Sequence, residues 1–127
     1  MTYVISVKND TTYTPLVQNI QLTNCEWYQP VVINDGQPIA TYKQAVGMLA
    51  VLATPASLKL RVHYCYLAPG PDGGNVDIEF RFDTLNDKPL TGFECTAIHD
   101  RLVCEFDVGR KDDDLFLIAT ISTKAQA

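Results

Sequence analysis

Apolar and polar residues alternate with a period of two along much of the chain. In residues 58–66, leucine, valine and tyrosine alternate with lysine, arginine, histidine and cysteine, and residues 76–82 alternate in the same way. This period predicts β-strands that place one face on a core and the other in solvent. Proline and glycine in residues 69–74, between the two segments, are typical of a wide hairpin loop.

Weaker signals indicate more short strands, at residues 2–8, 16–22 and 115–121. The last of these is almost wholly apolar, which favours a central place in its sheet. Residues 31–33 and 39–42 flank Asn34-Asp35-Gly36, a strong turn signal. We expect these two flanking segments to form a hairpin.

Residues 88–108 read as a hairpin that turns at His99-Asp100. This register opposes Cys95 with Cys104 in a non-hydrogen-bonded pair, with α-carbons about 4.5 Å apart. The expected apolar face comprises Phe93, Cys95, Ala97, Leu102, Cys104 and Phe106. We expect the two cysteines to be neighbouring free thiols in a reducing compartment, able to form a disulfide when oxidised.

Residues 43–55 form an apolar run that fits either a buried strand or a short helix. Gly47 weakens a helix by about 1 kcal/mol relative to alanine, and the surrounding segments are strands, so a strand is favoured. In total the pattern predicts about eight or nine short strands. We therefore predict an all-β fold, an antiparallel, jelly-roll-like β-sandwich, with residues 1–127 forming a single domain.

Composition narrows the function classes. A hydrophobic content of 46% with 20% charged residues suits a folded domain with a core. The net charge of −5 and the scattered basic residues argue against nucleic-acid binding, which needs a basic stripe. No apolar run is long enough for a transmembrane segment, and no signal peptide is recognisable. We expect a soluble protein, cytoplasmic or exported without a cleavable signal.

Catalytic and metal-binding motifs are absent from the sequence, so no catalytic residue, metal site or cofactor is assigned. The histidines, His63 and His99, lie in no metal or base motif, and the four cysteines fit no zinc spacing. Cys65 beside His63 is the one nucleophilic pair considered, and we interpret it as structural. Asp72 and the run 112–114 offer oxygen ligands for calcium, but without EF-hand spacing they are interpreted as solvated loops.

Trp27 and Tyr28 are the most suggestive residues for ligand binding. They lie in a polar segment that ends at Pro30, which indicates a loop rather than a regular strand. Aromatic rings with polar tips are favoured where proteins meet sugars or partners. We predict a ligand-binding site formed by Trp27 and Tyr28 with Asn34 and Asp35. The alternative is that the Trp27 ring folds back over the edge of the core.

These observations favour a non-enzymatic β-sandwich that recognises a carbohydrate, a lipid headgroup or a protein surface through loops at one end. A second hypothesis is a structural or self-assembling subunit, such as a viral or phage particle protein. In that hypothesis the apolar residues 46–52 would form a homo-oligomer interface. A small enzyme or toxin is the third.

Overall fold

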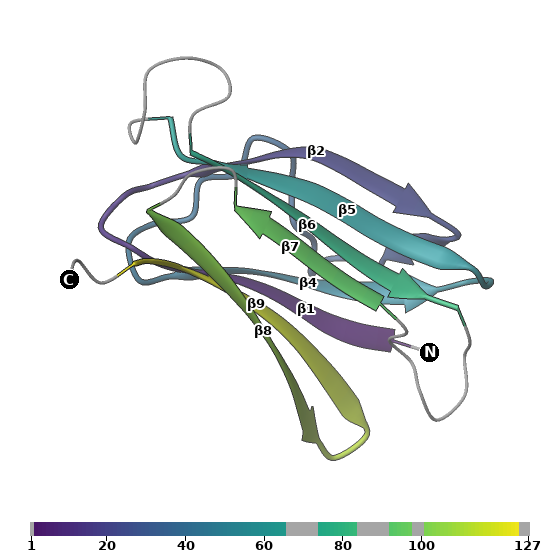
Figure 1. Cartoon of the computed structure of the whole chain (residues 1–127). Coiled ribbons are helices and arrows are strands. Elements are labelled where there is room, and N and C mark those ends of the chain that lie inside the picture. Colours follow the sequence, from purple (N-terminus) through teal and green to yellow (C-terminus); the bar gives the residue numbers. More distant parts are fainter. Residues whose placement is uncertain (1, 66–73, 84–91, 98–100, 125–127) are drawn as a thin grey trace.

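The computed structural model describes residues 2–65, 74–83, 92–97 and 101–124, and these form nine strands in two facing sheets (Figure 1). Sheet A contains, in spatial order, β3 (Cys25–Trp27), β4 (Gln44–Val51), β1 (Thr2–Asp10), β9 (Asp114–Thr123) and β8 (Leu102–Lys111). Sheet B contains β2 (Leu16–Thr23), β5 (Ala56–His63), β6 (Asn75–Phe82) and β7 (Gly92–Ala97). The prediction of an antiparallel β-sandwich with about eight or nine short strands is confirmed.

The centre of sheet A contains the one parallel pair among the described strands. β1 pairs antiparallel with β4 and parallel with β9, so that Ile5 lies beside Gly47 on one side and Leu117 on the other. The central position predicted for residues 115–121 is confirmed, and the ambiguous segment 43–55 contains strand β4. The parallel pairing brings the first and last strands of the chain together, which alternation alone does not predict.

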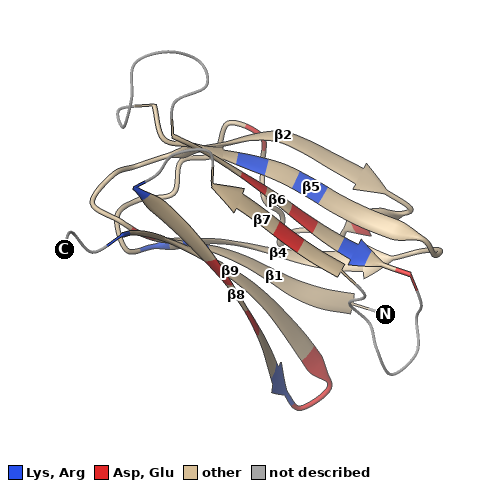
Figure 2. Ribbon diagram, viewed as in Figure 1, with Lys and Arg blue, Asp and Glu red and all other residues tan. Residues whose placement is uncertain are grey.

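The two sheets differ in the chemistry of their outer faces. Charged side chains occupy outward positions of β5 (lysine and arginine), β6 (aspartate, glutamate and arginine) and β7 (glutamate), whereas β1 and β4 carry few charges (Figure 2). An antiparallel sheet with one solvated face normally shows polar residues on that face, as sheet B does. Sheet A departs from this pattern.

The hairpin predicted for residues 88–108 is wrong in its strand pairing. β7 pairs with β6 at the edge of sheet B, and β8 pairs with β9 at the edge of sheet A. The chain therefore crosses from one sheet to the other between them. Residues 98–100, with the expected turn, lie outside the described residues. The predicted apolar face is nevertheless the inward one, because alternation fixes which side of a strand is apolar but not which neighbour it pairs with.

This side of the sandwich is closed by an aromatic cluster and a disulfide. The rings of Phe93 and Phe106 stack across the two sheets with centroids 4.0 Å apart, and Phe80 contacts both rings edge-on. Beside them, Cys95 and Cys104 form a disulfide, which corrects the expectation of free thiols. Their α-carbons are 6.0 Å apart, further than the expected value for paired strands, because the bridge joins the edges of two sheets.

On the opposite side, the segment between β3 and β4 closes the sandwich. The turn at Asn34–Gln37 is present, with a 3.1 Å hydrogen bond from the Gln37 amide to the Asn34 carbonyl. The flanking hairpin is wrong: this segment contributes a single bridge, from Pro38 to Leu16. The Val31 carbonyl accepts a hydrogen bond from Met48 in sheet A, and the Gln37 carbonyl accepts one from Val17 in sheet B. The segment thus spans both sheets.

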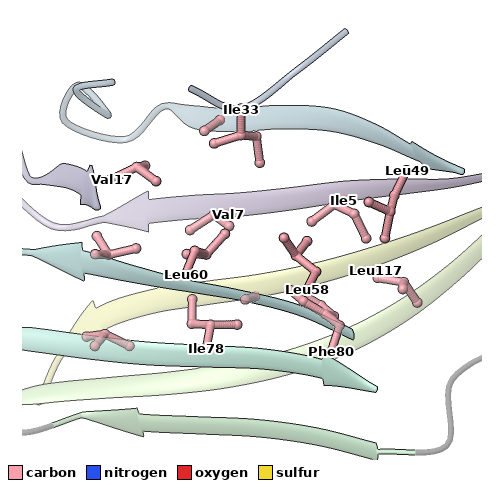
Figure 3. Close-up of a cluster of buried hydrophobic side chains, with 14 of the residues drawn as sticks. Ile5, Val7, Val17, Ile33, Leu49, Leu58, Leu60, Ile78, Phe80 and Leu117 are labelled. Atoms are coloured by element: carbon pink, nitrogen blue, oxygen red, sulfur yellow. The ribbon is translucent and has the colours of Figure 1, made fainter. Parts of the chain in front are cut away.

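The core lies between the inner faces of the sheets (Figure 3). Ile33, from the closing segment, packs into it together with side chains of both sheets, such as Ile5 and Leu58. Each fully buried side chain of this size contributes about 1.5–3 kcal/mol to folding relative to an exposed one. Ile33 and Ile39 are 1% and 2% exposed. Their burial between the sheets explains why this segment does not form the predicted hairpin.

A buried asparagine connects four parts of the chain. Asn9 is 0% exposed, and its Nδ2 donates to the carbonyls of Tyr13 and Ile39 at 2.7 and 3.0 Å. Its Oδ1 accepts hydrogen bonds from the hydroxyls of Thr11 and Tyr64 at 2.6 and 2.8 Å. Burial raises the pKa of the Tyr64 hydroxyl well above its usual value, which keeps it a neutral donor to Asn9.

Replacing both Cys95 and Cys104 with alanine is expected to lower the free energy of unfolding by about 2–3 kcal/mol, from the short loop that the bridge closes. Urea denaturation of the oxidised protein and the double variant measures this difference. Cys65→Ala is the control, because Cys65 is exposed and unbridged, and it should change stability by less than about 0.5 kcal/mol. Equal stability of the double variant and the wild type would contradict a stabilising role of the disulfide.

Asn9→Ala is expected to lower the free energy of unfolding by at least about 3 kcal/mol, because it leaves several buried polar groups without their partner. Thermal and urea denaturation followed by circular dichroism measure the loss. Asn34→Ala, at an exposed asparagine in the turn, should cost less than about 0.5 kcal/mol. A loss below about 1 kcal/mol for Asn9→Ala would show that water replaces the network.

Candidate functional site

The outer face of sheet B contains an open depression of about 420 Å³. Its lining comes from all four strands of the sheet, and eight of the ten lining residues are polar or charged. A volume of this order suits a small ligand or one or two sugar units. We take this depression as the candidate site among the described residues.

Strand register brings the polar side chains of the depression into two adjacent rows. In one row Gln21, Lys59, Glu79 and Glu94 lie side by side across the four strands. In the next, Arg61 lies beside Asp77, which is paired in register with Thr96. The basic side chains on the floor thus come from β5 and the acidic ones from β6 and β7, as the blue and red segments of these strands show (Figure 2).

Ion pairs connect these side chains across neighbouring strands. Arg61 makes a two-point contact with Asp77, from Nε to Oδ1 at 2.7 Å and from Nη2 to Oδ2 at 3.2 Å. The Nζ of Lys59 lies 3.5 Å from Oε2 of Glu79. Two-point arginine–carboxylate pairs are stronger and more directional than single contacts. The carboxylates keep further lone pairs that a ligand hydroxyl can reach.

A β-bulge in β2 shapes one rim of the depression. The register between β2 and β5 shifts between Gln18 and Gln21, and Asn19 adopts a left-handed backbone conformation with φ of 57°. Asparagine tolerates this conformation better than most residues. Bulges bend a strand and re-aim its side chains, and they often occur beside binding sites. Here the bulge places Asn19 in the lining of the depression.

The sequence suggested that Trp27 lies on a loop. The structure places it in a strand instead. It is the last residue of β3, paired with Leu49, and its half-buried ring packs against the core edge. An added Cβ at Gly47 would lie only 2.5 Å from Cζ3 of this ring, so the ring rests directly on the glycine backbone. This position matches the alternative interpretation of Trp27. Tyr28, in contrast, is 57% exposed.

Asn34 and Asp35 are exposed in the turn beside β2, where the Gly36 amide donates a 2.6 Å hydrogen bond to the Val17 carbonyl. None of the four residues predicted from the sequence, Trp27 and Tyr28 included, lines the depression. The charged alternation of β5 and β6 was visible in the sequence, but it also suits an ordinary solvated face. Recognising the site needed the register of β2 and β7 against these strands.

His63 and the buried Cys25 both contact neighbouring polar groups, and Cys65, the residue considered together with His63, is an exposed, unbridged thiol. The Nδ1 of His63 lies 2.6 Å from Oδ1 of Asn75. The buried Cys25 thiol donates to the Ser57 carbonyl at 3.3 Å, and burial raises its pKa, which lowers its reactivity. The residues that the structure describes contain no cluster of three or more histidine, cysteine or acidic side chains suited to a metal. Asp72 and His99 lie outside those residues.

No protein-family model matches this chain, and no curated protein is significantly similar to it. Among the described residues there is no helix that could cross a membrane.

Gly47→Ala is expected to lower the free energy of unfolding by about 1–3 kcal/mol, because the new methyl group would overlap the Trp27 ring. Trp27 is the sole tryptophan, so its fluorescence reports the displacement directly. Gly109→Ala is the matched control, since a Cβ there meets the Phe116 Cβ at an ordinary 3.8 Å. Unchanged stability and emission for Gly47→Ala would show that the Trp27 ring does not lie on this glycine.

Proposed function

We propose that this protein is a non-enzymatic binding module that recognises a carbohydrate on the outer face of sheet B. The observation that carries the proposal is the depression, with the Arg61–Asp77 pair fixed in its floor. Recognition by a sheet face replaces the loop-mediated binding that the sequence suggested. The rigid strands hold the polar groups in place, which reduces the entropy lost on binding.

The charges of the depression favour a neutral, polyhydroxylated ligand. Lys59 and Arg61 offer donors, and Asp77, Glu79 and Glu94 offer acceptors, so neither a strong anion nor a strong cation is matched. A sugar hydroxyl both donates and accepts, and adjacent hydroxyls can engage opposite ends of one ion pair. None of the lining residues is aromatic, so stacking is not available and the affinity of a single site should be low.

A self-assembling subunit is the second candidate function. The outer face of sheet A favours it, because several apolar side chains lie on outward positions of central strands. The two candidates use opposite faces of the sandwich and do not exclude each other.

A glycan array followed by NMR titration with the best-bound sugar tests the proposal. Asp77→Asn removes the acceptor charge from the depression while preserving the side-chain shape, and it should weaken binding at least about 10-fold. Asp35→Asn makes the same chemical change in the turn at Asn34–Gln37, and it should leave binding unchanged.

The opposite result, in which Asp35→Asn abolishes binding and Asp77→Asn does not, would place the site at the loop residues instead. Binding only to lipid vesicles, or to no glycan at all, would overturn the carbohydrate proposal. Amide shifts on β5 and β6, with none at Trp27, are the expected NMR signature.

A further inference from the structure

The outer face of sheet A is apolar across its centre. Register places Val4 of β1 between Met48 of β4 and Phe116 of β9, all facing outward. In the adjacent row, Val46 and Ile118 flank Ser6. We call the five apolar residues of these two rows the apolar band. Tyr28 extends it towards the β3 edge, where its amide donates a 2.7 Å hydrogen bond to the Met48 carbonyl.

The apolar band can be desolvated at little cost. Its one polar neighbour within the rows, Ser6, is 5% exposed and donates a 2.7 Å hydrogen bond to Oε1 of Gln44. No charged side chain lies between the β4 and β9 ends of the two rows, and the first charge beyond them is Asp107 of β8, which is paired in register with Ile118. On the opposite side of the same molecule, the outward positions of sheet B are occupied by ion pairs. The contrast indicates that the face of sheet A is covered by a partner, whereas that of sheet B is solvated.

We infer that two copies of this chain associate face to face through the outer faces of sheet A. Five strands about 4.8 Å apart, with a mean length of about eight residues, give a face of roughly 600 Å² per copy. Two copies would bury about 1,200 Å², the lower end of the range for specific interfaces. This inference rests on sheet A alone and does not depend on the carbohydrate proposal.

The register makes this face complementary to itself. A two-fold axis across the strands, midway between the two rows, sets Phe116 of one copy opposite Ile118 of the second copy. The same operation sets Met48 opposite Val46. Aligned sheets pack with their strands within about 30° of each other, which preserves this correspondence near the axis.

Charges at the β8 edge support a second copy as the partner. Glu105 pairs in register with Thr120, and Lys111 with Asp114, so both project outward from β8 on either side of the two rows. The two-fold axis brings Glu105 of one copy opposite Lys111 of the second copy. Within one chain, six residues separate them by about 20 Å along the strand, so they cannot pair there. Glu105 and Lys111 can therefore meet only between copies, whereas Lys111 also lies beside Asp114 within its own chain.

Sedimentation velocity from about 1 µM to about 200 µM tests the inference, because interfaces of this size and modest affinity dissociate in that range. The wild type should approach twice the 14.1 kDa of one chain. Ile118→Asp should weaken association about 100-fold by placing a charge in the apolar contact. Thr23→Asp, exposed on the outer side of sheet B, should have no effect. Circular dichroism confirms that each variant is folded.

Charge reversal tests the two-fold arrangement itself. Glu105→Lys should weaken association about 3- to 10-fold, and Glu105→Lys combined with Lys111→Glu should restore it. Such rescue identifies a contact between copies, since the two side chains are distant within one chain. A monomer at every concentration, an assembly larger than a dimer, or no rescue in the double variant would overturn the inference. Loss of glycan binding with the dimer intact would bear only on the proposed function.

Discussion

Because the two sheets do not join into a barrel, water could enter the core along both sides, where the edge strands of sheets A and B face each other. Each side is closed differently. On one, Phe93 stacks on Phe106 and the neighbouring disulfide ties β7 to β8. On the other side, the segment between β3 and β4 forms hydrogen bonds with both sheets. The Asn9 side chain also donates a hydrogen bond to the carbonyl of Ile39 in this segment. The separation of inner and outer faces depends on both closures.

Alternation predicted the strands and their faces well, because the direction of a side chain from a strand is a local property of the backbone. It placed Phe93 and Cys95 on the same inward face as Cys104 and Phe106, as the structure does. Alternation did not predict which strands pair, because pairing depends on residues distant in the sequence. In the structure β7 pairs with β6, and β8 pairs with β9. Cys95 and Cys104 are nevertheless close together, as predicted. Inward side chains approach each other both in paired strands and in edge strands of two facing sheets.

The candidate site was less predictable than the fold. Trp27 stood out in the sequence because tryptophan is rare and the neighbouring residues are polar. In the structure the Trp27 ring lies on the flat backbone surface of Gly47, which is two residues along β4 from Leu49, the strand partner of Trp27. That contact links residues far apart in sequence. Conversely, Arg61 and Asp77 looked like parts of two ordinary solvated strands. Only cross-strand register joins them into one two-point pair beside the bulge at Asn19.

The opposed chemistry of the two outer faces gives a geometric connection between the proposals. If copies associate through sheet A, their sheet B faces must point away from each other, on opposite sides of the pair. Under the proposed function, a depression without an aromatic ring would bind one sugar weakly, since hydrogen bonds to a ligand largely replace hydrogen bonds to water. Two such depressions on one dimer could bind two glycans at once, one on a surface and one elsewhere. Linked sites gain avidity without new contacts. Opposite orientation favours bridging between two glycan-bearing surfaces over double attachment to one, because both sites cannot face the same plane.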